Sequence, residues 1–356
     1  MIYFNSDYTE GAHESILNAL VRTNLEQTPG YGTDDYCREA ASRVRALCGN
    51  TAPDVHFLVG GTQTNATVIS AALRGHQGVI SADTGHIHVH ETGAVEATGH
   101  KVLALPHQNG KITAEQVKHV WQVHHEDDSA EHCVEPKMVY ISQPTEFGTL
   151  YSKEELKALY EVCRACGMYL FIDGARLGYG LAAADSTLDF ASLAGLCDVF
   201  YIGGTKMGAL FGEAVVIQKD DLKPAFRYYI KRHGGMLAKG RLLGLQFAEL
   251  LKDDLYLSLG RHADELADLI RDALFQNEIP LVMENRTNQI FCLLTEKQLQ
   301  QLSEQFVLSV QDKMPDGRRL VRICTSWATK KEHVQMLIEH LNTLSACAGS
   351  NVSEKQ

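Results

Sequence analysis

The stretch DVFYIGGTKMGALFGEAVVI, residues 198 to 217, contains two apolar runs joined by a short connection rich in small residues. Parallel strands need a connection of about a dozen residues or more, so the two runs are predicted to be antiparallel neighbours in one sheet. Lys206 is the only cation in the stretch. For a Gly-Thr-Lys triplet alone, a lysine at the exposed end of a strand is the commoner interpretation. A buried lysine, in contrast, is driven toward the neutral amine and is costly unless it serves as a nucleophile.

Further apolar runs precede this stretch, and most are continuous, as is typical of strands covered on both faces. Helical patterns separate several of them; residues 152–166 open with a Ser-x-x-Glu capping box and stop at Gly167. The alternation predicts an α/β fold with a mostly parallel seven-stranded sheet in a large domain, residues 1–250. A smaller α+β domain is expected over 251–346, with a disordered tail at 347–356. The five earlier runs are residues 55–60, 78–83, 101–106, 137–142 and 168–173.

Composition narrows the classes of partner. The chain has 356 residues and a formal net charge of −11, which argues against a general affinity for nucleic acid or for anionic membranes. Its nine cysteines are scattered without paired metal spacing, and its first residues carry no positively charged leader. We therefore expect a cytoplasmic protein that acts on small solutes.

Polar residues follow three of the predicted strands, at the edge of the sheet where ligands collect in open α/β folds. The segment GGTQTN opens a helix after the first strand, so that the amides of Gly61, Thr62 and Gln63 can face a phosphate. Asp173 ends the fifth strand and Lys206 follows the sixth. This ordered set matches pyridoxal phosphate, which forms a Schiff base with a lysine and places its pyridine nitrogen beside an acid.

The sequence resembles the low-specificity L-threonine aldolases, which have the aspartate-aminotransferase-like fold of pyridoxal-phosphate enzymes (fold type I). The resemblance covers nearly the whole chain and is carried, in order, by NSDYT, GYGTDD, GGTQTN, GHIHVHETG, IDGARLG, GGTKMG and LVRICTSWATKKE. It implies an aldehyde-lyase that cleaves L-threonine or L-allo-threonine to glycine and an aldehyde. It also implies a homodimer or homotetramer with sites at the subunit boundary.

The resemblance implies roles for individual residues. Lys206 would form the Schiff base, Asp173 would pair with the pyridine nitrogen, and His86 would lie against the ring. Ser6 and Arg322 would bind the substrate carboxylate, which suits the forked guanidinium of arginine. The expected cofactor-binding set is Gly61, Thr62, Gln63, His86, Asp173, Arg176, Thr205 and Lys206. The expected substrate-binding set is Ser6, Arg176, Arg322 and Tyr31, with Tyr31 reaching the neighbouring subunit's pocket, and the expected catalytic set is Lys206, His86, Asp173 and Glu146.

Two positions depart from the family pattern. Glu146 stands where many members have a histidine, and Leu237 stands where many have an arginine that reaches the phosphate. Lys239 and Arg241 are candidates to supply the missing charge. The general base stays open among His86, Glu146 and a bound water. The segment HIHVHE lacks a further residue to complete a metal site, so no metal is expected.

Other functions remain possible on the same cofactor. The first alternative is a β-eliminating lyase or another fold-type-I enzyme acting on a related amino acid, because the cofactor supplies the chemistry and side chains steer it. The second is a non-catalytic protein that kept the fold. A nicotinamide-binding protein is disfavoured because the helix at GGTQTN lacks the G-x-G-x-x-G pattern.

Overall fold

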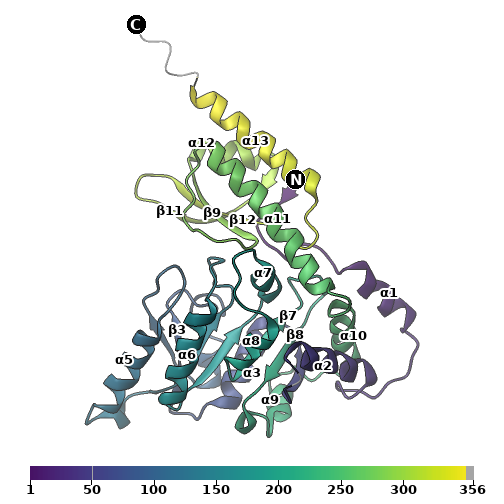
Figure 1. Cartoon of the computed structure of the whole chain (residues 1–356), viewed down its shortest axis with the longest axis vertical. Coiled ribbons are helices and arrows are strands. Elements are labelled where there is room, and N and C mark those ends of the chain that lie inside the picture. The colour runs from purple at the N-terminus through teal and green to yellow at the C-terminus, as the bar shows by residue number, and fades with distance from the viewer. Residues whose placement is uncertain (50, 350–356) are drawn as a thin grey trace.

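The computed structural model describes residues 1–49 and 51–349, and its larger part is built on a seven-stranded sheet (Figure 1). The strand order is β2-β8-β7-β6-β5-β3-β4, and β8 runs antiparallel to both of its neighbours while the other pairs are parallel. The predicted fold class and the antiparallel pairing of the last two runs are confirmed. The strands are β2 (Asp54–Leu58), β3 (Gln77–Ala82), β4 (Val102–Leu105), β5 (Glu135–Ser142), β6 (Tyr169–Asp173), β7 (Val199–Gly203) and β8 (Glu213–Ile217).

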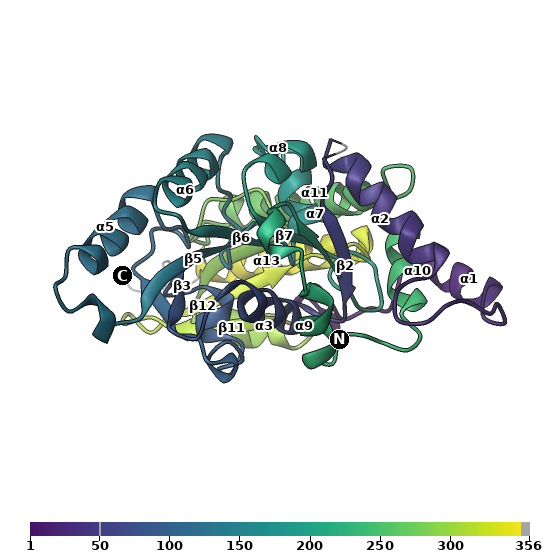
Figure 2. The ribbon, with the colours of Figure 1, turned by 90° about the horizontal axis from the view of Figure 1, so that it is seen from below.

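Helices cover both faces of this sheet, with α6 and α8 on one side and α3 and α9 on the other (Figure 2). Each face has its own apolar core because successive strand residues point to opposite faces. In β7, Phe200 and Ile202 belong to the core beneath α6 and α8, whereas Val199 and Tyr201 belong to the core beneath α3 and α9. Burial on both faces explains why the strand sequences are continuously apolar.

Local signals set the ends of several helices. In α6 (Lys153–Ala165), Ser152 and Glu155 form the predicted capping box, and Gly167 follows the helix with a positive φ of 63°. In α2 (Asp35–Leu47), the Asp34 side chain accepts a hydrogen bond from the Cys37 N–H. The other helices of this part are α1 (Glu14–Arg22), α3 (Gly61–Ala72), α4 (His86–Val89), α5 (Ala114–His125), α7 (Leu177–Ala182), α8 (Phe190–Gly195), α9 (Phe226–Arg232) and α10 (Arg241–Leu250), with 3-10 turns at Glu96–Thr98, Ala130–His132 and Asp220–Leu222.

The smaller part has an antiparallel sheet in the order β11-β12-β9 and a separate apolar core. The first residues of the chain, expected to form an amino-terminal arm of the large domain, contact this smaller part. β1 pairs in parallel with β10, and Phe4 lies in the smaller core, so the chain begins there and then crosses to the large domain. The elements are β1 (Ile2–Tyr3), α11 (Leu255–Gln276), β9 (Gln289–Leu294), α12 (Glu296–Ser303), β10 (Phe306–Val307), β11 (Ser309–Lys313), β12 (Arg319–Cys324) and α13 (Lys331–Gly349).

The last helix, α13, extends into the segment that was expected to be a disordered tail. α13 continues to Gly349, so the predicted tail is helical over 347–349, and its remainder, 350–356, lies outside the described residues. Within the described ranges, no helix combines the length and apolar character needed to cross a membrane.

Candidate active site

The carboxyl ends of β5, β6 and β7 lie side by side, and they bring the predicted site residues together. Ser142 at the end of β5 is in register with Asp173 at the end of β6, and Gly203 at the end of β7 leads directly to Thr205 and Lys206. The turn after β6 lies close against β7. A Cβ atom at Gly174 would overlap the backbone carbonyl oxygen of Tyr201. Glycine at this turn is therefore a packing requirement of the site.

Asp173 is buried and accepts hydrogen bonds on both carboxylate oxygens. Oδ2 accepts from the Tyr140 hydroxyl at 2.6 Å and from Asn65 Nδ2 at 3.1 Å, and Oδ1 accepts from the Ala175 N–H at 3.0 Å. Burial alone would raise the pKa of Asp173, but nearby His86 and these hydrogen bonds outweigh it and hold the pKa below its usual value. Asp173 is therefore a fixed anion at the strand end.

Lys206 is partly buried at the turn after β7. The hydroxyl of Tyr179 donates to the Lys206 carbonyl oxygen at 2.5 Å, which fixes the backbone of the turn. The Nζ atom lies 5.8 Å from the centre of the Tyr8 ring. Burial lowers the pKa of Lys206, and the positive charge of Arg176 lowers it further. Lys206, the only cation of residues 198–217, is thus placed where the nucleophilic amine is favoured.

Glu213 is an acidic neighbour of Lys206 that the sequence analysis did not single out. Its Oε1 accepts from the Thr205 hydroxyl at 3.0 Å, and its Oε2 accepts from the Gly204 N–H at 3.3 Å. Burial raises the pKa of Glu213, while the charge of Lys206 opposes that rise. Thr205, predicted to bind cofactor, therefore uses its hydroxyl within the protein to hold Glu213 beneath the turn.

His86 and Glu146 are neighbours, as two candidate bases should be. Glu146 Oε1 accepts hydrogen bonds from the backbone N–H of His86 at 2.9 Å and from the Ser142 hydroxyl at 2.6 Å. Burial raises the pKa of Glu146 above its usual value, which moves its titration toward neutral pH. His86 Nδ1 lies 2.8 Å from Oε1 of Glu91, an acid whose side chain is fully buried.

Arg176 forms a buried ion pair that the sequence did not reveal. Its Nε and Nη2 atoms donate to the two oxygens of Asp7 at 2.6 and 3.0 Å. Asn288 Nδ2 also donates to Asp7, at 2.9 Å. Burial opposes ionisation, but the charges of Arg176 and Lys206 lower the pKa of Asp7 to about 2. The guanidinium is oriented by Asp7, with Nη1 left outside this pair.

Arg322 and Ser6 lie close together, as their predicted shared role requires. Arg322 Nη2 donates to the carbonyl oxygen of Asn5, the residue before Ser6, at 3.0 Å, and Nη1 donates to Gln289 Oε1 at 3.3 Å. Arg322 Nε is buried without a hydrogen-bond partner among the described residues. A buried donor of this kind is costly unless a ligand takes its hydrogen bond.

The amino terminus of α3 provides backbone donors. Gly60, which precedes Gly61, gives the helix no side-chain cap, so the first N–H groups of α3 are not capped by that residue. The Gln63 side chain is already engaged, since it accepts from the Val59 N–H and donates to the His233 carbonyl. Gly61 and Thr62 thus offer backbone N–H groups for a phosphate, and any contribution of Gln63 comes from its backbone.

These features fit pyridoxal phosphate. A fixed anion at Asp173, a lysine with a lowered pKa and uncapped N–H groups at α3 are the three features this cofactor requires. The buried Tyr201 hydroxyl lies against the start of α3, since a Cβ atom at Gly61 would come within 3.2 Å of it. Tyr201 is a further donor that the sequence did not mark.

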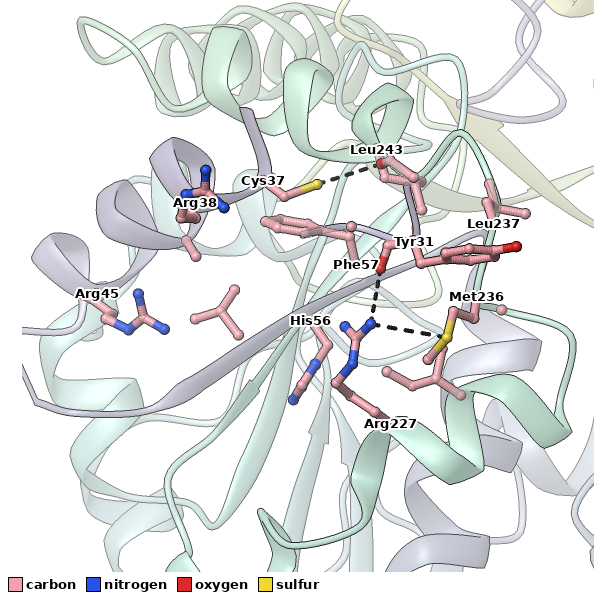
Figure 3. Close-up of a pocket in the computed structure, with 16 residues that line it drawn as sticks. Tyr31, Cys37, Arg38, Arg45, His56, Phe57, Arg227, Met236, Leu237 and Leu243 are labelled. Atoms are coloured by element: carbon pink, nitrogen blue, oxygen red, sulfur yellow. Dashed lines mark hydrogen bonds between the residues drawn. The ribbon is translucent and has the colours of Figure 1, made fainter. Parts of the chain in front are cut away.

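Tyr31 lies apart from this group, in a cavity of about 330 Å³ at the open edge of β2 (Figure 3). Its side chain is 49% exposed, its backbone N–H donates to Ala238, and Arg227 Nη2 donates to its carbonyl oxygen. Leu237 also lines the cavity, whereas Lys206 and Asp173 do not. Within this one chain, Tyr31 is therefore not part of the cluster around Lys206.

One of the two candidates to replace the missing phosphate-binding arginine is engaged elsewhere. Arg241 is buried and donates to the carbonyl oxygens of Thr23 and Glu26 and to the Thr23 hydroxyl. Its role is to tie α10 to the loop after α1, so it is not free to supply that charge. Lys239 is exposed.

Comparison with known proteins places the chain in a family. Residues 4–297 match the family model described as beta-eliminating lyase. The chain belongs to the beta-eliminating lyase family. A low specificity L-threonine aldolase of Pseudomonas sp. (strain NCIMB 10558) is 30% identical over 343 residues, which are 94% of this chain and 95% of that protein. The corresponding Pseudomonas aeruginosa protein is 29% identical over 341 residues, again 94% of this chain and 95% of that one.

Solved structures agree. A Leishmania major threonine aldolase has a TM-score of 0.94 and 42% identity, covering 97% of this chain and 100% of that one. A Thermus thermophilus aspartate aminotransferase has a TM-score of 0.70 at 15% identity, covering 97% of this chain and 91% of that one, which shows a shared fold. The resemblance to threonine aldolases stated from sequence motifs is confirmed.

Besides Tyr201, four polar residues of the candidate site escaped the sequence analysis, although three of them lie inside motifs that it used. Asp7 is in NSDYT, Asn65 in GGTQTN and Glu91 in GHIHVHETG, whereas Glu213 begins β8. Each is buried. A polar residue within a motif, at a position that the fold buries, was the available signal.

Proposed function

We propose that the protein is a pyridoxal-phosphate-dependent aldehyde-lyase that cleaves L-threonine or L-allo-threonine to glycine and acetaldehyde. The observation that carries the proposal is the pairing of a fixed anion, Asp173, with a lysine of lowered pKa, Lys206, at the ends of adjacent strands. The similarity to threonine aldolases over the whole chain selects this reaction among those of the fold.

Binding of the amino acid is assigned to the arginine side of the site. Arg322, with its buried unpartnered Nε, and Ser6 beside it take the substrate carboxylate. Arg176, held by Asp7, presents its remaining nitrogen Nη1 to the same region. Arginine forks are suited to a carboxylate because they offer several donors in one plane.

Proton transfer is assigned to His86 and Glu146. When bound, the cofactor withdraws electrons from the substrate Cα. As the Cα–Cβ bond breaks, the β-hydroxyl proton passes to His86 or Glu146, and the new glycine gains a proton at Cα. The two residues are neighbours, because the backbone N–H of His86 donates to Glu146 Oε1. Burial raises the pKa of Glu146, which makes its carboxylate a stronger base than an ordinary glutamate.

Product analysis tests this proposal. The purified protein, loaded with pyridoxal phosphate, is incubated separately with L-threonine, L-allo-threonine and L-serine, and glycine, acetaldehyde, ammonia and keto acids are measured. Glycine with acetaldehyde is expected from threonine. Ammonia with 2-oxobutanoate would instead establish the β-eliminating alternative, and no product from any of the three would favour a non-catalytic protein.

We also propose a cytoplasmic homodimer or homotetramer in which Tyr31 completes the neighbouring subunit's site. The half-exposed Tyr31 ring, apart from its own chain's Lys206, supports a role across a subunit boundary. The eight cysteines whose surroundings are described are all free, which supports a reducing compartment. The complementation experiment in the Discussion tests the assembly.

A further inference from the structure

A chain of hydrogen bonds connects the buried anion Asp173 with the imidazole of His86. On one side, Asn65 Nδ2 donates to Asp173 Oδ2 at 3.1 Å and to Glu91 Oε1 at 2.8 Å, and the same Glu91 oxygen lies 2.8 Å from His86 Nδ1. On the other side, the backbone N–H of His86 and the Ser142 hydroxyl both donate to Glu146 Oε1, and the Tyr140 hydroxyl donates to Asp173 Oδ2.

The orientation of the Asn65 amide follows from its two partners. Asp173 is ionised, since its pKa is lowered, and an ionised carboxylate only accepts hydrogen bonds. The Asn65 atom that faces Asp173 must therefore be the NH₂ group, which donates and cannot accept. The same NH₂ group faces Glu91, so Oε1 of Glu91 is an acceptor there.

This fixes the role of Nδ1 in His86. In its carboxylate form Glu91 only accepts hydrogen bonds, and Oε1 accepts from Asn65 through one lone pair and keeps another for His86. Oε1 can then hydrogen-bond His86 Nδ1 only if that nitrogen carries the proton. In the neutral imidazole the other nitrogen, Nε2, keeps its lone pair.

We propose that Glu91 is a positioning residue that holds His86 in the Nδ1–H tautomer, so that Nε2 is the nitrogen able to accept a proton at the site. The tautomer is a property of the chain itself, whereas its use in taking the β-hydroxyl proton rests on the proposed function. Asn65 donates to Glu91 Oε1, and the same oxygen accepts the hydrogen bond from Nδ1 of the imidazole. Asp173 orients the Asn65 amide, and through Glu91 this orientation determines which ring nitrogen of His86 carries the proton.

The tautomer can be observed directly. In full-length protein labelled with ¹⁵N-histidine, long-range proton–nitrogen spectra distinguish a protonated from an unprotonated ring nitrogen. The chain has 16 histidines, so the His86 signals are assigned by their loss in His86→Gln. An Nδ1–H signal for neutral His86, with or without cofactor, is expected. An Nε2–H signal in the wild-type protein would overturn the inference whatever reaction the enzyme catalyses.

Variants at position 91 separate positioning from bulk structure. Glu91→Ala removes the acceptor and is expected to release the tautomer and lower kcat by roughly 100-fold, the scale of one general acid–base contribution, with KM little changed. Glu91→Gln keeps an oxygen that can accept from both Asn65 and His86, so it should retain the Nδ1–H signal and recover most of the lost kcat. Glu96→Ala, at an exposed position in the next turn, is the matched control and should behave like the wild type.

Three results would contradict the proposal. The first is a wild-type kcat in Glu91→Ala although the His86 tautomer has changed. The second is a Glu91→Gln protein that is as slow as Glu91→Ala although His86 keeps the Nδ1–H tautomer. The third is a loss of kcat in Glu96→Ala equal to that in Glu91→Ala. If Glu91→Ala does not fold, the wild-type tautomer and the Glu91→Gln kinetics still decide the question. A wild-type protein that shows the expected tautomer but makes no glycine would instead count against the proposed function.

Discussion

Replacing Asp7 by asparagine should destabilise the protein strongly, because it leaves the guanidinium of Arg176 buried without its counter-charge. The pKa of Asp7 is lowered from 3.8 to about 2, and at about 1.36 kcal/mol per unit this corresponds to roughly 2.4 kcal/mol of net stabilisation of the ionised form. Breaking a buried pair from one side commonly costs about 3–5 kcal/mol, so a loss of about 3 kcal/mol is expected for Asp7→Asn at pH 7.

Urea unfolding followed by circular dichroism measures this loss. Asp316→Asn is the matched control, because Asp316 pairs with Arg318 on an exposed turn and its replacement should leave the unfolding midpoint unchanged. Since the folded pKa of Asp7 is depressed, its contribution is present above pH 3.8 and disappears as the pH falls toward 2. If Asp7→Asn has the same unfolding midpoint as Asp316→Asn, the conclusion that Asp7 stabilises the fold by compensating the buried charge of Arg176 is refuted.

Further predictions concern the reacting groups and the assembly. Lys206→Ala should lose the cofactor adduct that borohydride traps in the wild-type protein, as detected by mass spectrometry; an equal adduct in the variant would exclude Lys206 as the attachment point. Asp173→Asn should keep much of its cofactor, measured by absorption, but lose most of its turnover, because an amide does not stabilise a protonated pyridine nitrogen. Because burial raises the pKa of Glu146, any activity that needs its ionised form should increase as the pH rises through that shifted value. Glu146→Gln should remove this limb of the pH–rate profile, and an unchanged profile would leave His86 or a bound water as the base. Mixing inactive Lys206→Ala chains with impaired Tyr31→Ala chains should restore activity if Tyr31 acts across the subunit boundary, and no recovery in mixed oligomers shown to have formed would place Tyr31 outside the neighbouring site.

Sequence patterns were informative where the signal was local. The continuous apolar runs identified the seven strands of the main sheet, and Asp173 at the end of β6 and Lys206 in the turn after β7 indicated the candidate site. The pairing of β1 with β10 was not predictable, because two residues carry no periodicity. Asp7 and Glu91 were missed for a related reason. Their partners Arg176 and Asn65 are 169 and 26 residues away in the sequence, and only the folded chain shows which acids are buried together.

The most direct test of the central claim is a proton NMR time course of L-threonine with the cofactor-loaded protein in D₂O. Cleavage of the Cα–Cβ bond predicts acetaldehyde and glycine in equal amounts, with one deuterium at the glycine Cα, and no such products from Lys206→Ala. Formation of 2-oxobutanoate and ammonia without glycine would contradict the assignment of this protein as a threonine-cleaving aldehyde-lyase.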